Sequence, residues 1–292
     1  MRYRVTHRTS YAYSLPVVLC HNEARLEPRE TGRQRCLQST VAVEPTPTER
    51  AARDDFFGNR VLYFSVEEKH EQLAVTATSE VELIAAAAAP DLDASPAWET
   101  VREALTQPTD GETRVAMQFV LDSACAAAAP ETRAYAEPSF APGRPILSAV
   151  ADLGRRIHRE FRFDPESTTV STAVAEVLAQ RHGVCQDFAH LAIACLRSLG
   201  LPARYVSGYL ETETAPGQPR LQGIDASHAW LAVFAPGLGW VDFDPTNDCR
   251  PAERHVTTAW GRDYADVTPV KGVIFGGGAH TLAVSVDMVR IE

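Results

Sequence analysis

Positive charge is scarce in this chain of 292 residues. Its 28 lysines and arginines face 38 aspartates and glutamates, for a formal charge of −10, and only Lys69 and Lys271 are lysines. Nucleic acids and anionic lipid surfaces both attract proteins through clustered basic side chains. The composition argues against a general affinity for either, so we expect no nucleic acid and no membrane among the partners. It makes no prediction of oligomeric state.

A long apolar run is also missing. Residues 1–13, MRYRVTHRTSYAY, contain nothing like the apolar core of a signal peptide. No later stretch approaches the roughly 20 apolar residues that a membrane span requires, and the alanine tract at 85–89 ends at Pro90. We therefore expect a cytoplasmic protein, whose thiols are kept reduced.

The cysteines lack the spacings of disulfide or metal chemistry. No CxxC pair and no ladder of cysteine and histidine at zinc spacing occurs in the sequence. We expect no metal and no cofactor, and the useful question is whether one thiol is reactive. The six cysteines are Cys20, Cys36, Cys125, Cys185, Cys195 and Cys249.

Apolar residues are plentiful at 45%, enough to build a core. Alternating polar and apolar residues with turn signals between them predict a β-rich N-terminal domain over 1–85. Residues 86–145 form a linker rich in alanine and proline that leads into a helical segment. Helical periodicity over 146–159 and 186–199, then strands at 204–210, 228–234 and 240–244 with a polar loop after 210, predict an α+β core over 146–292 with a C-terminal β extension.

Cys185 stands at the start of the second of these helices. Phe188, Leu191 and Leu199 lie on its apolar stripe, and Gly200 ends it. A thiol at a helix N-terminus meets the positive end of the helix dipole and unpaired backbone N–H groups, which favour the thiolate and can hold a developing oxyanion. Helix starts often carry small polar residues for structural reasons alone, so a catalytic cysteine also needs a base.

The hairpin over 228–244 supplies a base and an acid. Burying Leu231 and Val233 together with Val241 and Phe243 requires a register in which the numbers of paired residues sum to an even value, because a one-residue slip mixes the two faces. A three-residue loop then sets His228 opposite Asp244. A five-residue loop makes them diagonal neighbours that are still within reach.

Asp244 is thus the expected partner of His228, since Asp242 would face it only across an implausibly tight turn. The carboxylate would accept a hydrogen bond from one imidazole nitrogen and the other nitrogen would take the proton of the Cys185 thiol. Considered alone, a histidine in a strand is usually solvated or hydrogen-bonded for structural reasons. An aspartate followed by a proline, as Asp244 is by Pro245, is usually a turn former. The combination predicts the catalytic triad Cys185, His228 and Asp244.

The motifs around these residues resemble those of the bacterial transglutaminase-like cysteine protease family. The matching segments extend to Asp55–Asn59 near the N-terminus and to Gly261–Val267 near the C-terminus. The resemblance implies a papain/transglutaminase-like α+β core, with the Cys-bearing helix packed on an antiparallel sheet, after a β-rich N-terminal domain. It places the nucleophile, base and acid on the same three residues. The core motifs are GVCQDFAH at 183–190, ARYVSGY at 203–209, HAW at 228–230 and WVDFDPT at 240–246.

The expected activity is thiol-dependent acyl transfer on a peptide, isopeptide or glutamine-type amide, with a peptide or protein amide as substrate. The resemblance favours hydrolysis, as in a cysteine protease or amidase. A transglutaminase with an amine acceptor and a non-catalytic peptide-binding scaffold are the alternatives. A metal site on His228 and Asp244 lacks further ligands at fixed spacing. His190 is expected to point away from Cys185 and either to support a residue of the site or to serve packing. Trp230 and Trp240 either wall the cleft or pack in the hairpin.

Overall fold

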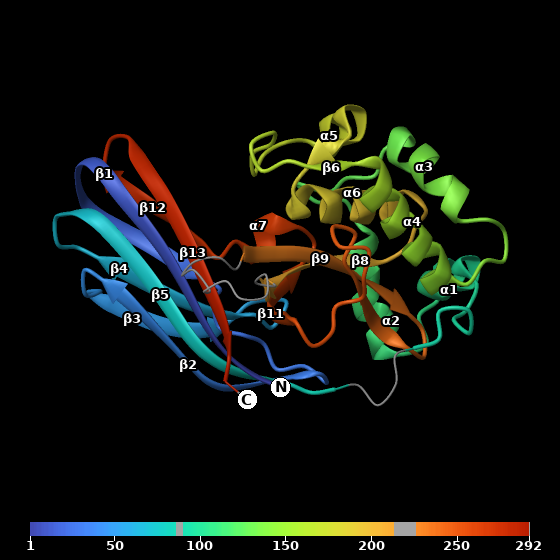
Figure 1. The fold of residues 1–292 in the computed structure, drawn as a ribbon, viewed down its shortest axis with the longest axis horizontal. Helices are drawn as coiled ribbons and strands as arrows, with labels where there is room; N and C mark the ends of the chain where they lie inside the picture. The colour runs from blue at the N-terminus through green and yellow to red at the C-terminus, as the bar shows by residue number, and fades with distance from the viewer. Residues whose placement is uncertain (86–89, 213–225, 292) are drawn as a thin grey trace, which may run out of the picture.

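The computed structural model describes residues 1–85, 90–212 and 226–291, which form two main antiparallel β-sheets with helices packed on the second. The alanine-rich segment 86–89 and most of the polar loop predicted after Leu210 lie outside the described residues. In Figure 1 the large sheet lies to the left, and the smaller sheet with its helices lies to the right. Among the described residues, no helix has the length and apolarity to cross a membrane.

The large sheet, called here the N-terminal sheet, is built around the long strand β1. Every second residue at its start is buried, as at Tyr3, Val5, His7 and Thr9, which is the alternation of a half-buried strand. The strand order is β2-β5-β1-β4-β3, and β12 and β13 also pair with β1. The strands are β1 (Arg2–Ala24), β2 (Gln34–Glu44), β3 (Glu49–Asp54), β4 (Arg60–Val66), β5 (His70–Leu83), β12 (Val270–Gly276) and β13 (His280–Arg290).

The two C-terminal strands return to this N-terminal sheet. Strand β13 pairs with the first half of β1, from Tyr3 opposite Arg290 to Tyr13 opposite His280, and β12 pairs with the second half. Figure 1 shows them in red beside the blue strand β1. The sequence pattern predicted that the C-terminal β extension belongs to the core domain over 146–292. In the structure its hydrogen bonds join it to the N-terminal sheet, a pairing that local alternation cannot specify.

A buried cluster joins this sheet to the core: Val286 and Met288 of β13 pack in it with Tyr209 and Val256. Val286 is 1% exposed. Replacing Val286 with alanine removes two buried methyl groups and leaves a cavity, and it should lower the free energy of unfolding by roughly 2 kcal/mol. Urea denaturation would measure this. The matched variant Val289→Ala, at a side chain that is 45% exposed, should change stability little, and equal losses would contradict the prediction.

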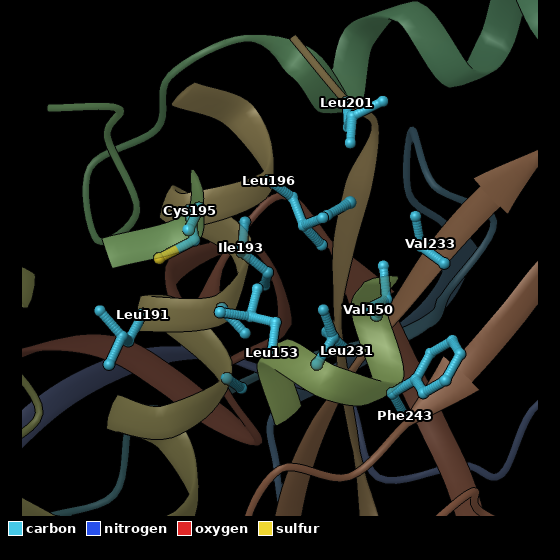
Figure 2. Packing of buried hydrophobic residues seen from close by; sticks show 14 of the residues in the cluster. Val150, Leu153, Leu191, Ile193, Cys195, Leu196, Leu201, Leu231, Val233 and Phe243 are labelled. Carbon is cyan, nitrogen blue, oxygen red and sulfur yellow. The ribbon is translucent and has the colours of Figure 1, made fainter. Parts of the chain in front are cut away.

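The second sheet, called here the core sheet, has the strand order β10-β9-β8-β11. One face packs against helices α4 and α6, which confirms the predicted α+β core. Figure 2 shows Leu153 of α4 and Ile193 of α6 gathered around Leu231 of β9. The elements are α4 (Ile146–Glu160), α6 (Cys185–Ser198), β8 (Ala203–Leu210), β9 (Ala226–Ala235), β10 (Gly239–Phe243) and β11 (His255–Gly261).

The other helices are short, and of these α3 and α5 pack against α6, whereas α7 packs on β8 and β11. A small parallel pair, β6 and β7, leads into α6 and places Gly183 two residues before Cys185. The remaining elements are α1 (Trp98–Thr106), α2 (Gly111–Ala116), η1 (Met117–Val120), α3 (Pro130–Ala136), η2 (Glu137–Ser139), β6 (Arg162–Phe163), α5 (Val174–Gln180), β7 (His182–Gly183) and α7 (Tyr264–Val267).

Candidate active site

Cys185 is the first residue of α6 and is half-buried. Val184 before it is extended, so the chain turns sharply into the helix. The carboxylate of Asp187 caps this turn, because its Oδ2 accepts hydrogen bonds from the Val184 backbone N–H at 2.8 Å and from the Thr168 hydroxyl at 2.7 Å. The cap fixes the direction in which the helix starts and therefore the position of the Cys185 sulfur.

Gly183 makes room for this cap. A Cβ atom built on Gly183 would lie 2.8 Å from Oδ2 and 2.9 Å from Cβ of Asp187, both closer than such contacts normally come. Gly183→Ala should therefore displace the Asp187 carboxylate and slow the alkylation of Cys185 by iodoacetamide. Gly154→Ala in α4 is the matched control, since its Cβ would meet atoms only at 3.9 Å and beyond. Equal alkylation rates for Gly183→Ala and the unmodified protein would show that the cap does not position the thiol.

The hairpin of β9 and β10 has the predicted parity. Phe234 lies opposite Trp240 and Leu231 opposite Phe243, which is the register predicted for the longer loop. Pairing continues one step into the turn, to Ala235 opposite Gly239. His228 and Asp244 are accordingly diagonal neighbours, and His228 Nε2 lies 2.7 Å from Asp244 Oδ2.

Asp244 is a buried acceptor surrounded by donors. Its Oδ1 accepts the backbone N–H groups of Thr246 at 2.9 Å and Asn247 at 3.2 Å. Its Oδ2 accepts from His228 and from the Asn247 amide at 2.7 Å, and His255 Nε2 lies 3.2 Å away. Burial alone would raise the pKa of Asp244, but hydrogen bonds from His228 and His255 lead the contributions that hold it well below its ordinary value.

An ionised Asp244 determines the tautomer of His228. A carboxylate only accepts hydrogen bonds, so the proton of the imidazole must sit on Nε2, and Nδ1 is left for another partner. Burial lowers the pKa of His228, but hydrogen bonds with Asp244 and Cys185 and the charges of both groups outweigh it and raise the pKa to about 10. The histidine thus interacts with both other members of the predicted triad.

Sequence reasoning missed two residues of this site, Asn247 and His255. The Asp-Pro-Thr-Asn run could have indicated Asn247, because an aspartate before a proline commonly accepts N–H groups two and three residues on. His255 belongs to β11 on the far edge of the core sheet, and no local pattern connects it with Asp244.

These side chains also form a cluster of possible metal ligands. Within the parts of the chain that the structure describes, one group of this kind occurs, and its ligand atoms on His228, Asp244 and His255 all lie within 4.8 Å of one another. Both imidazole Nε2 atoms face the same carboxylate oxygen as hydrogen-bond donors. A nitrogen that carries a proton cannot ligate a metal, so this geometry fits a hydrogen-bond network better than a metal centre.

The raised pKa of His228 predicts how its stabilising effect depends on pH. The folded pKa of about 10 lies above the ordinary 6.5. The contribution to stability is therefore complete below about pH 6.5 and is lost as the pH rises through 10. Urea unfolding of the unmodified protein and of His228→Gln measures that contribution. The difference between the two proteins should shrink from pH 6.5 to 10, and a constant or growing difference would contradict the assignment.

Comparison with known proteins identifies the family. Residues 3–82 match the family described as the bacterial transglutaminase-like N-terminal region, and residues 133–245 match the transglutaminase-like superfamily. Uncharacterized protein Rv2569c of Mycobacterium tuberculosis is 43% identical over the whole of this chain and 93% of its own length. The chain belongs to the transglutaminase-like superfamily. Protein ML0607 of Mycobacterium leprae is 34% identical over 99% of both chains.

A solved structure shares the fold of this transglutaminase-like chain. It is a protein from Cytophaga hutchinsonii, described provisionally as a cysteine protease, with a TM-score of 0.76 and 21% identity over all of this chain and 91% of its own. The protein-glutamine gamma-glutamyltransferase of Pseudomonas aeruginosa is 32% identical over 126 residues, which are 42% of this chain and 19% of that protein. The family and the core fold are thus shown.

Of the other candidate residues, His190 serves packing, and the remaining five cysteines are unsuited to be the nucleophile. His190 is 2% exposed, accepts the Tyr264 N–H at 3.1 Å, and has a pKa lowered to about 4 by burial, in keeping with the predicted packing role. Burial raises the pKa of each of the other cysteines, to about 12 for Cys195. These thiols are poor nucleophiles, because the thiolate is the reactive form.

Proposed function

We propose that this transglutaminase-like chain is a thiol-dependent acyl-transfer enzyme in which Cys185 is the nucleophile, His228 the general base and acid, and Asp244 the orienting acid. The observation that carries the proposal is the 2.7 Å hydrogen bond from His228 Nε2 to Asp244 Oδ2. It keeps the proton on Nε2, so that Nδ1 can accept the thiol proton of Cys185. The substrate class is a peptide, isopeptide or glutamine-type amide.

The chemical steps follow from these positions. The Cys185 proton is held on His228 Nδ1, because the raised pKa of His228 favours the imidazolium, and the sulfur attacks the carbonyl carbon of the amide. As the C–N bond breaks, Nδ1 returns the proton to the leaving amine, and an acyl-enzyme thioester remains. Water or an amine then attacks the thioester carbonyl, and its proton passes through His228 to restore the thiol.

The start of α6 provides the oxyanion donors. The first backbone N–H groups of a helix have no partner within it, so the N–H of Cys185 can point at the developing oxyanion. The side chain of Gln186 is already engaged, because its Nε2 donates to the Val170 carbonyl at 3.2 Å. A backbone donor is therefore a better assignment than the neighbouring amide.

The preferred acceptor is water, which makes the enzyme a cysteine protease or amidase. The resemblance of the core motifs to bacterial cysteine proteases supports hydrolysis, whereas the name of the Pseudomonas aeruginosa relative supports an amine acceptor. Ammonia or amine release from a mixed peptide and isopeptide library, with and without an added primary amine, distinguishes them by mass spectrometry. Hydrolysis predicts free acids in both samples, and a product containing the added amine would favour a transglutaminase.

A non-catalytic peptide-binding scaffold with the same fold is the competing function. Such a scaffold could retain Cys185, His228 and Asp244 without using them. Library members that bind but are never cleaved, equally by the unmodified protein and by Cys185→Ala, would establish it. For the enzyme we propose a reducing compartment such as the cytoplasm, because the catalytic thiol must stay unoxidised.

A further inference from the structure

A cavity of about 710 Å³ lies on the face of the core sheet that turns away from α6. Loops of the N-terminal sheet and residues of α2 and η1 complete its walls. Its volume falls in the range of small-molecule sites, roughly 300–1,000 Å³. Cys185 is absent from the described residues that line it, whereas His255, which lies 3.2 Å from Asp244, is among them, so the cavity adjoins the site of acyl transfer without containing its nucleophile. The aromatic and charged residues that line the cavity include Phe119, Arg204, Trp230, Trp240, Asp242 and Trp260.

The Arg204 guanidinium lies against two tryptophan rings in the wall of this cavity. Its guanidinium carbon lies 3.8 Å from the ring centre of Trp260 and 4.5 Å from that of Trp240, so two indoles stack on it. The residue is only 9% exposed, and its Nε finds no hydrogen-bond partner in the described chain. Stacking satisfies the faces of a guanidinium but leaves its edge, which is the part that donates to carboxylates. The edge of Arg204 is therefore available to a ligand.

Asp242 brings the opposite charge to the same cavity. Burial raises the pKa of Asp242, whereas the charge of Arg204 and the indole of Trp230 act to lower it. Arg204 and Asp242 affect each other through their charges, with no hydrogen bond between them. Two charges taken out of water are costly unless each is paired. A ligand that carries both an anionic and a cationic group would pair each of them.

We propose that this cavity binds a zwitterionic aromatic amino acid. The ligand carboxylate accepts hydrogen bonds from the edge of Arg204, the ligand ammonium faces the Asp242 carboxylate, and the ring packs against Trp230 and Phe119. The site goes beyond the proposed acyl transfer, and its ligand contacts use none of Cys185, His228 and Asp244. A failure of the Cys185 chemistry therefore leaves this prediction standing, and a failure here leaves that chemistry untouched.

Tryptophan fluorescence of the full chain tests the site, because three of its four tryptophans line the cavity. The probes are L-phenylalanine, 3-phenylpropanoate, which lacks the amine, and phenethylamine, which lacks the carboxylate. L-phenylalanine should give a saturable change, and each of the other two should bind at least roughly tenfold more weakly, the scale of one lost hydrogen bond to a charged group. Absence of a saturable change with L-phenylalanine up to its solubility, or equal binding of all three probes, would overturn the proposal.

Three variants give the test a second arm. Asp242→Asn keeps the shape of the side chain and should weaken L-phenylalanine roughly tenfold while leaving 3-phenylpropanoate unweakened. Arg204→Met should weaken both. Should Arg204→Met fail to fold, Val115→Trp narrows the cavity from an exposed lining position, with Val273→Trp as its matched exposed control. Full L-phenylalanine affinity in Asp242→Asn and Val115→Trp would overturn the site.

Discussion

Replacing Cys185 with alanine is expected to lower the rate of amide cleavage by roughly 10⁶-fold, the scale of losing the nucleophile of a catalytic triad. The half-buried sulfur lies at the start of α6, where backbone N–H groups and the partner histidine meet. No neighbouring hydroxyl or thiol takes its place in the proposed steps. The measurement is the rate of product formation from any library member that the unmodified protein cleaves, followed by mass spectrometry.

Cys36→Ala serves as the matched control for that variant. Cys36 lies in β2 of the N-terminal sheet, and burial raises the pKa of its thiol to about 11. The control should retain full activity, and brief treatment with iodoacetamide should label Cys185 in it before any other cysteine. A Cys185→Ala protein that keeps even a tenth of the activity would exclude Cys185 as the nucleophile, and a Cys36→Ala protein that loses it would show that the loss is not specific to Cys185.

The local part of the site could be predicted from the sequence because it depends on short-range geometry. The start of α6 follows from an apolar stripe with a period of 3.6, so the place of Cys185 on the helix needed no tertiary information. The relation of His228 to Asp244 follows from strand parity, since burying one face of the hairpin excludes every odd register. The observed pairing of Phe234 with Trp240 confirms this.

The nonlocal part could not be predicted in the same way. His255 reaches Asp244 only because β11 pairs with β8, and the partner of a strand is not encoded in its own alternation. The same reason applies to β12 and β13, whose pairing with β1 spans nearly the whole sequence. The cavity around Arg204 is likewise visible only after distant segments are folded against the core sheet.

Asp244→Asn is expected to lower the rate of amide cleavage by about 10⁴-fold while the fold is kept. An asparagine amide can donate to His228 Nε2, which then becomes an acceptor and moves the imidazole proton to Nδ1. A protonated Nδ1 cannot accept the thiol proton of Cys185. The pKa of His228, now about 10, should also fall, because the Asp244 carboxylate is the leading contribution that raises it. Imidazole ¹⁵N shifts measured by NMR would report both the tautomer and the pKa.

The matched control is Asp152→Asn, which makes the same chemical change in α4. Asp152 forms an ion pair with Arg144, with Oδ2 and Nη1 3.4 Å apart, and takes no part in the proposed steps. This variant should keep the ¹⁵N shifts of His228 and the cleavage rate within a few-fold of the unmodified protein. Equal losses in the two variants would mean that the effect does not come from the hydrogen bond between Asp244 and His228. A loss confined to Asp244→Asn, together with the changed tautomer, assigns the effect to the orientation of His228.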